Sequence, residues 1–421
     1  MIVPGVLRVA AFRRYWFASL ASNAGSWLQI VAAGWLVFQL TRSPAAVGLL
    51  ALVARAPAIA LSGYAGRLAD RHDRRNVGIA TFALQGIAAA ALAVLSAVDH
   101  LPLVAIYVAT FAVGCGMALG LPAVLAMVGT LAGRDRLPQA VALNAAGINV
   151  ARLVGPSLGG IVLALAGPAW CFAVNAVSFG TLVGVLLSLP PFPPADPGSR
   201  SRMREAIRYA RATPAPRRLL IGMTVFAAFA APVQELAPVI TAEFGLGAIW
   251  LGVLLGAMGG GALVGAWLFA RLGRRGYPSH HALPMATTVF ALAAAAVAAA
   301  PWYPVALVAM FVGGVVWIWM YIATNACLQL RSPPALLGRM LGLYQLAVLG
   351  PIAIGSQLVG AWAEVVGIRW ALATSAAILG IWGCFSLTHR VPSIDGDGPD
   401  SEHGFTEGIL ARAHRHHRAV G

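Results

Sequence analysis

The sequence contains no lysine and is poor in charge of either sign. Charged residues make up only 10% of its 421 residues, whereas hydrophobic residues make up 59%. An ordinary soluble domain carries about 25% charged residues. The composition therefore excludes an ordinary soluble domain and predicts a protein that crosses a membrane several times.

Cysteine is scarce as well, and the motifs of several enzyme classes are missing. Four cysteines, at positions 115, 171, 327 and 384, lie in apolar segments without the spacing of metal ligands, so we expect packing residues and no metal site. The sequence lacks the P-loop and HExxH patterns. Their absence argues against ATP as a direct energy source and against an integral-membrane enzyme, and we expect no cofactor.

The basic residues, all 29 of them arginine, give a net charge of +15, which in a soluble protein suggests nucleic-acid binding. Here, however, most arginines fall in the two tails and in alternate loops between apolar segments, while Arg42 and Arg369 fall in the opposite loops. This asymmetry is the positive-inside signal of a membrane protein. We therefore expect these arginines to contact membrane lipids and not nucleic acid.

About 20 apolar residues cross the hydrocarbon layer as a helix, and this length predicts twelve spans with both termini cytoplasmic. The expected spans are 15–40, 45–66, 76–98, 102–131, 140–166, 168–189, 218–242, 248–270, 282–300, 302–330, 338–364 and 370–389. We thus predict an all-α integral membrane protein in the bacterial plasma membrane.

A proline-rich and basic stretch separates the sixth span from the seventh. Residues 201–211 in this stretch are predicted to form a short basic amphipathic helix on the membrane surface, although a solvated connector is an equal alternative. The chain then divides into four parts, the last being a polar, acidic tail expected to be disordered. These parts are a six-helix bundle at 1–190, a basic linker at 191–217, a second six-helix bundle at 218–390 and the tail at 391–421.

The two predicted bundles share a weak internal repeat, which is typical of transporters. Phe111 and Gly114 recur as Phe311 and Gly314 in the second half. Two further matches occur in the same order, Arg67–Arg71 with Arg271–Arg275 and Gly155-Pro156 with Gly350-Pro351. Together they favour a duplicated arrangement of six plus six helices.

Three charged residues lie well inside predicted spans, where a charge costs about 2.5–3.5 kcal/mol on insertion scales. Glu235 is the candidate for proton coupling, because burial raises the pKa of a carboxyl group toward values at which it can take up and release a proton. The alternative is a solvated gate residue at the outer mouth. Arg55 and Arg152 make the first half locally cationic, which suits a carboxylate or catecholate substrate. A purely structural role of Arg152 is equally compatible with the sequence.

Polar side chains at helical spacing are the remaining candidates for the wall of a substrate cavity. They are Asn23, Gln29 and Asn149 in the first half, and Gln234, Tyr321 and Asn325 in the second. The spacing of Asn23 and Gln29 on the first span lets both drift across one side of a helix.

A cluster of ionisable residues between the second and third spans must lie in water, on the cytoplasmic side. Its motif residues are Gly66, Leu68, Asp70, Arg71, Arg74 and Arg75. This pattern within twelve spans resembles the signature loop of the major facilitator superfamily. A second stretch, containing Gly155, Pro156, Gly159 and Gly160, resembles the Gly-Pro motif of antiporter branches, which suits close approach of the half-bundles.

A narrower resemblance covers the whole chain. The segments Gly34–Pro44, Leu137–Asn144, Asn149–Gly155 and Gly338–Met340 are similar to those of the enterobactin-exporter-like group of transmembrane secretion effectors. The fourth span carries no charge, which departs from the antiporter pattern and puts an arginine-assisted proton relay there in doubt.

The resemblance implies alternating access by two six-helix bundles about a midplane site, driven by proton entry. It further implies that Asp70 accepts hydrogen bonds at the start of the eleventh span near Arg339 and holds the cytoplasmic side shut, with Asp135 as a partner for the loop arginines. The alternative is that these arginines only anchor the topology.

We therefore predict a monomeric secondary transporter that exports a small amphipathic or anionic molecule, siderophore-like or drug-like, coupled to protons. A lipid or lysophospholipid flippase of the same fold is the first alternative, and a transport-inactive sensor or scaffold is the second. The presence of Asp70 argues against the second alternative.

Overall fold

The computed structural model describes residues 5–192, 203–273, 282–333 and 336–388. The regular structure in these ranges is entirely helical. Its first part comprises η1 (Gly5–Arg8), α1 (Ala10–Thr41), α2 (Pro44–Arg71), α3 (Arg74–Ala97), α4 (Leu103–Ala132), η2 (Arg134–Arg136), α5 (Leu137–Ala166) and α6 (Pro168–Leu187). Its second part comprises α7 (Met203–Ala212), α8 (Pro214–Glu235), α9 (Ala237–Glu243), α10 (Ala248–Gly273), α11 (Ala282–Ala299), α12 (Tyr303–Arg331), α13 (Leu337–Val366) and α14 (Ile368–Thr388).

Ten of the described helices are long and apolar enough to cross a membrane, so the protein is an all-helical, multi-pass chain. In addition, α11 contains a shorter apolar run, Leu283–Ala299, and α1 is 32 residues long but is not among the ten. The amphipathic helix expected in the linker is present as α7. The polar tail beyond residue 390 lies outside the described residues.

One predicted span differs in detail, because residues 218–242 form two helices, α8 and α9, that meet at Leu236. Pro238 explains the break. Proline has no N–H to donate to the carbonyl of Gln234 four residues earlier, and its ring crowds that carbonyl. The chain therefore bends directly after Glu235, one of the three charged residues singled out above.

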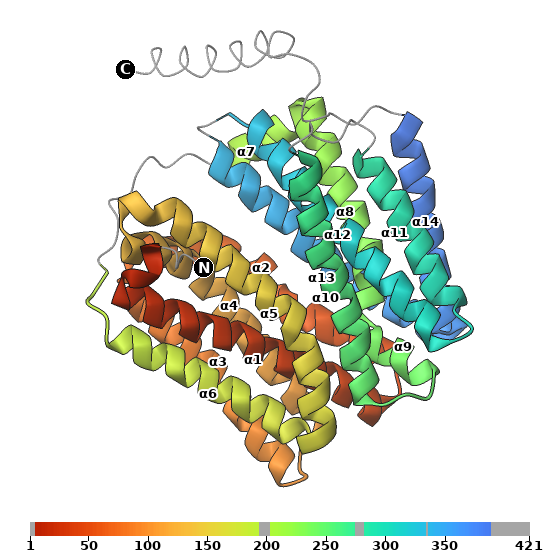
Figure 1. The fold of residues 1–421 in the computed structure, drawn as a ribbon, viewed down its shortest axis with the longest axis horizontal. Helices are drawn as coiled ribbons and strands as arrows, with labels where there is room; N and C mark the ends of the chain where they lie inside the picture. The colour runs from red at the N-terminus through yellow and green to blue at the C-terminus, as the bar shows by residue number, and fades with distance from the viewer. Residues whose placement is uncertain (1–4, 193–202, 274–281, 334–335, 389–421) are drawn as a thin grey trace.

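The long helices form two sets, which Figure 1 shows on opposite sides of the molecule. Helices α1 to α6 pack on one another, and α8 and α10 to α14 pack on one another. Contacts between the two sets are concentrated in two antiparallel pairs, α2 with α13 and α5 with α10. These two pairs determine how the halves of the protein meet.

The two sets touch closely at one end of these pairs and lie apart at the other. A β-carbon at Gly48 of α2 would lie 2.5 Å from the backbone oxygen of Ser356 of α13, and one at Gly160 of α5 would lie 2.5 Å from the Cα of Gly252 of α10. At the opposite end of α2, nothing outside its own helix lies within 4 Å of a β-carbon at Gly66. We call the closed end the Gly48 end and the other the Asp70 end.

The same glycine spacing supports the internal repeat. Gly114 of α4 packs on the backbone of α2 at Ala54, and Gly314 of α12 packs on the backbone of α10 at Met258. Each glycine thus lets the fourth long helix of its set approach the second. The equivalent contacts are what a duplicated six-helix unit would produce.

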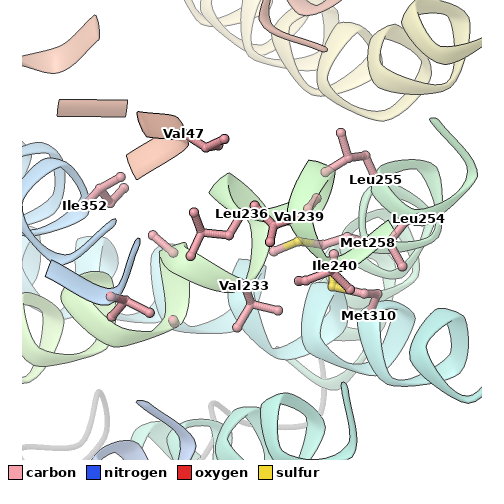
Figure 2. Packing of buried hydrophobic residues seen from close by; sticks show 14 of the residues in the cluster. Val47, Val233, Leu236, Val239, Ile240, Leu254, Leu255, Met258, Met310 and Ile352 are labelled. Atoms are coloured by element: carbon pink, nitrogen blue, oxygen red, sulfur yellow. The ribbon is translucent and has the colours of Figure 1, made fainter. Parts of the chain in front are cut away.

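A buried apolar cluster joins the sets near the Gly48 end (Figure 2). It includes Val47 of α2, Leu236 at the bend between α8 and α9, and Ile352 of α13, together with Met258 of α10 and Met310 of α12. This layer seals the space between the helices on that side. The polar candidate site borders it.

Candidate substrate and coupling site

An ion pair between Arg55 and Glu235 joins the two sets of helices. The guanidinium of Arg55 on α2 binds both carboxylate oxygens of Glu235, with 3.4 Å between Nη1 and Oε2 and a closer contact between Nη2 and Oε1. Arg55 Nη1 also donates to the carbonyl of Ala51, at 3.2 Å. The sequence marks both residues as unusual, but it contains no signal that they pair.

The position of the pair places it deep in the apolar layer. Arg55 lies eleven residues after Pro44, roughly 16 Å along the helix axis, which is about half the thickness of a bilayer core. The side chains of Arg55 and Glu235 retain 25% and 18% of their exposure, respectively, so water reaches both. The pair is thus not sealed inside the protein.

Arg152 adds a second cation to this site. It lies in the middle of α5, half-buried, within electrostatic range of Arg55 and of Tyr321 on α12. Unlike Arg55, it makes no hydrogen bond or ion pair with any residue in the described ranges. Two guanidinium groups and one carboxylate give the cluster a net positive charge, which favours an anionic ligand.

Aromatic and amide groups of the second set support the same cluster. The hydroxyl of Tyr321 donates to Gln345 Oε1 at 3.1 Å, and the hydroxyl of Tyr344 donates to the carbonyl of Tyr321, also at 3.1 Å. The two tyrosine rings lie edge to face, with centroids 5.5 Å apart. Tyr321 is thereby held at the side of the site that faces Arg152.

The other predicted cavity residues do not join this cluster through any contact that the structure records. Gln29 is buried and accepts a hydrogen bond from Asn175 Nδ2 at 2.7 Å, which ties α1 to α6. Asn23 and Asn149 donate to carbonyls one turn earlier in their own helices, and Asn325 accepts from Gln329. Gln234, next to Glu235, is half-buried. Their place in a substrate cavity stays a prediction.

The charged loop between α2 and α3 divides into two parts. Asp73 begins α3: its side chain accepts from the backbone N–H of Arg75 at 2.8 Å and from that of Phe192 at 3.2 Å. The Arg75 side chain donates to the carbonyls of Leu186 and Leu187 at the end of α6. This part holds α3 to α6 within the first set, and a cation at a helix C-terminus is favourable.

Asp70 and Arg71 form the other part of the loop and are exposed at the Asp70 end. Within the described ranges, the Asp70 carboxylate makes no hydrogen bond or ion pair. Among the described residues, the start of α13, its expected partner, has no capping side chain, and a buried nitrogen of Arg339, Nη1, has no hydrogen-bond partner. The expected gate contact is thus not made by the described residues in this conformation.

The loop also contains a residue that sequence reasoning missed. Asp73 sits directly before the first residue of α3, the N-cap position that Asp strongly favours. That position was the available signal. Of the named motif residues, Gly66 and Leu68 lie on the last turns of α2, and Arg74 has a buried Nε without a hydrogen-bond partner.

The Gly-Pro stretch of α5 packs against two neighbouring helices, α1 and α10. Gly155 packs on Trp27 and Gly159 on Leu28, both on α1, whereas Gly160 packs on Gly252 of α10 in the other set. Pro156 lies inside the helix. One face of this stretch therefore builds the first set, and the adjacent position brings the two sets together.

Comparison with known proteins extends these observations. The sequence profile of the transmembrane secretion effector family matches residues 4–420. An enterobactin exporter, EntS, of Salmonella choleraesuis (strain SC-B67) is 30% identical over 359 residues, which span 83% of this chain and 85% of the relative. EntS of Citrobacter koseri is 28% identical over 358 residues, with 83% and 84% covered.

Solved structures with the same fold are also transporters. A POT family transporter in complex with 5-aminolevulinic acid superposes with a TM-score of 0.73 at 13% identity, covering 90% of this chain and 96% of that one. The nucleoside transporter NupG superposes with a TM-score of 0.69 at 13% identity, covering 90% and 98%. At these identities the likeness concerns the fold alone.

Family, relatives and fold agree with the ten apolar helices. The protein is a multi-pass membrane transporter of the efflux type in the bacterial inner membrane, and it is not an enzyme. The chain belongs to the transmembrane secretion effector family.

Proposed function

We propose that this protein exports a small amphipathic or anionic molecule by proton-coupled alternating access, with the Arg55–Glu235 pair as the lock between its halves. The halves are the six-helix bundles at 1–190 and 218–390, working as a monomer. The ion pair between the halves is the single observation that carries the proposal. The relatives named for enterobactin export make a siderophore-like anion the first substrate class to test.

The lock follows from the cost of charge in an apolar layer. Removing one partner from a fully buried ion pair costs about 3–5 kcal/mol, and the water that reaches this pair lowers that figure. An intact pair holds α2 against the bend between α8 and α9, so the empty, deprotonated protein keeps the conformation described above. Two ligands release it: a proton that neutralises Glu235, and an anion that takes Arg55.

Alternate binding of the anion and the proton exchanges substrate for protons across the membrane. An anion entering from the Asp70 end binds Arg152 and competes with Glu235 for Arg55, which allows the halves to switch and expose the site on the Gly48 end. After the anion leaves, a proton neutralises Glu235 and permits the return. The proton is then released at the Asp70 end, and the ion pair between Arg55 and Glu235 forms again.

The direction of transport rests on the charge of the loops. The Asp70 end carries the arginine-rich loop between α2 and α3, so the positive-inside rule assigns it to the cytoplasm. We count α1 and α11 as spans in addition to the ten apolar helices, since both elements start and end level with them in an antiparallel bundle (Figure 1). Twelve spans then place both termini in the cytoplasm.

Glu235→Gln tests the lock. Because an amide cannot hold the Arg55 guanidinium by charge, we expect the variant to exchange substrate down its gradient but to lose acceleration by a proton gradient. Transport into inverted vesicles, with and without a protonophore, measures this. Glu243→Gln, a carboxylate paired with Arg369 inside the second half, is the control. Full proton-driven export by Glu235→Gln would contradict the proposal.

Arg152→Ala tests the anion site. A hydrogen bond to a charged group contributes about 1.5–3 kcal/mol, so we expect at least roughly tenfold weaker binding of a carboxylate-bearing substrate. The neutral methyl ester of the same compound should bind equally well to the variant and the parent protein. Arg369→Ala, an arginine paired with Glu243 inside the second half, is the control. Equal weakening for acid and ester would assign Arg152 a structural role instead.

Asp70→Asn tests the cytoplasmic gate. The neutral amide is a weaker partner for the start of α13 and for Arg339, so the conformation closed at the Asp70 end loses stability and we expect export to fall severalfold. Protein level in the membrane is measured alongside, with Glu205→Gln of α7 as the control acid. Export at the parental rate would reduce the loop to a topology signal.

A further inference from the structure

The α2–α13 pair carries a second acid at the end opposite Asp70. Glu364 lies on the last turn of α13 and reaches across to the other half, where its Oε2 accepts from the Ser43 hydroxyl at 2.7 Å and from the backbone N–H of Ala45 at 3.3 Å. Ser43 is the N-cap of α2, with its side chain accepting from Ala46 N–H. Glu364 therefore completes the cap of a helix that belongs to the opposite half.

The charges at the helix ends favour this contact over a conformation in which Glu364 has no partner on α2. A carboxylate in the last turn of a helix is repelled by the negative end of that helix, whereas the free N–H groups at the start of another helix attract it. Glu364 meets the first condition on α13 and the second on α2. Its energy is thus lower when the two helix ends are together than when they are apart.

The backbones beside Glu364 are shaped for close contact. A β-carbon at Gly360, one turn before Glu364, would lie 2.6 Å from the carbonyl of Pro44, and Gly48 packs directly on Ser356. Any side chain larger than hydrogen at these glycines would push the helix ends apart. The cap therefore lies at the exposed edge of a close interface that continues into the apolar cluster around Val47.

The arrangement at Glu364 has a counterpart at the Asp70 end. The helices are antiparallel, with Gly48 opposite Ser356 and Gly350 opposite Ile59, so continuing along the pair brings Asp70 opposite Arg339 at the start of α13. Asp70 also lies in the last turn of its own helix. Each helix thus carries one acid in its last turn that faces the start of the other helix, and in this conformation only the Glu364 contact is made among the described residues.

We propose that Glu364 is the outer gate latch: it caps α2 across the two halves while the protein is open to the cytoplasm and releases α2 when the protein opens outward. The assignment of this end as the outer one rests on the function proposed above. The latch itself depends only on the contacts between α2 and α13. Glu364 and Asp70 would then alternate, one acid capping the partner helix in each conformation.

Thiol labelling of Val47→Cys tests the latch, in full-length protein whose four native cysteines are replaced. Val47 is 2% exposed between the two halves next to the latch, so its labelling rate by a membrane-impermeant maleimide reports opening of this end. Loss of a helix-cap carboxylate of this kind corresponds to roughly fivefold more opening. We expect Glu364→Ala to raise the labelling rate about that much, and Ser43→Ala to raise it less.

Two matched variants separate a latch from a general loss of stability. Glu364→Gln keeps an acceptor oxygen and should fall between parent and Glu364→Ala, while Glu243→Ala, an outer-end acid paired within the second half, should leave the rate unchanged. Parental labelling rates in both Glu364→Ala and Ser43→Ala would overturn the latch. So would an equal increase in Glu243→Ala.

The side from which the reagent acts distinguishes this proposal from the proposed function. Labelling is measured in right-side-out and in inverted vesicles. An increase seen from the outer face supports both. An increase seen only in inverted vesicles keeps the latch but reverses the assigned direction of the transporter, whereas no increase from either side refutes the latch and leaves export untouched.

Discussion

The structure depends on the cost of holding charge inside an apolar layer. Arg55 and Glu235 come from different halves of the chain, and each makes the other tolerable at membrane depth. The bend after Glu235, the tight α2–α13 and α5–α10 contacts and the sealed apolar cluster all serve to bring these two side chains together. In the proposed transport cycle, a proton or an anion would have to replace the energy that holds this pair.

The proposals give distinct roles to acids on α8, α2 and α13. Glu235 of α8 would set when the halves can move, because its charge decides whether Arg55 is held. Glu364 and Asp70 would set which end is closed, because each faces the start of a helix in the opposite half. Switching then exchanges one helix cap for another, so neither conformation needs an additional buried charge.

Much of this was predictable from local sequence. Helix lengths, the arginine-rich loop and the glycine spacing depend on residues near one another in the chain, and the family and fold agree with them. Arg55, Arg152 and Glu235 were singled out as candidates by the cost of charge alone. The role of Asp73 as a helix cap could also have been predicted, because an acid directly before a helix is a local signal.

The pairings across the halves were not predictable in the same way. Arg55 and Glu235 are 180 residues apart, and Ser43 and Glu364 are 321 apart, so only the docking of one helix set on the other brings them together. Gln29 shows the converse: its spacing on α1 suits a cavity wall, yet Asn175 of α6 binds it inside the first set. Periodicity finds the polar face of a helix but not the neighbour that covers it.

The lock is tested most directly by the distance between spin labels at the Asp70 end, on Asn76→Cys of α3 and Leu330→Cys of α12, without substrate. In the parent protein the account predicts a single long distance, because the Arg55–Glu235 pair is intact. In Glu235→Gln, which has no carboxylate to hold Arg55, a second and shorter distance should appear. An identical distance distribution in the parent protein and in Glu235→Gln would contradict the account.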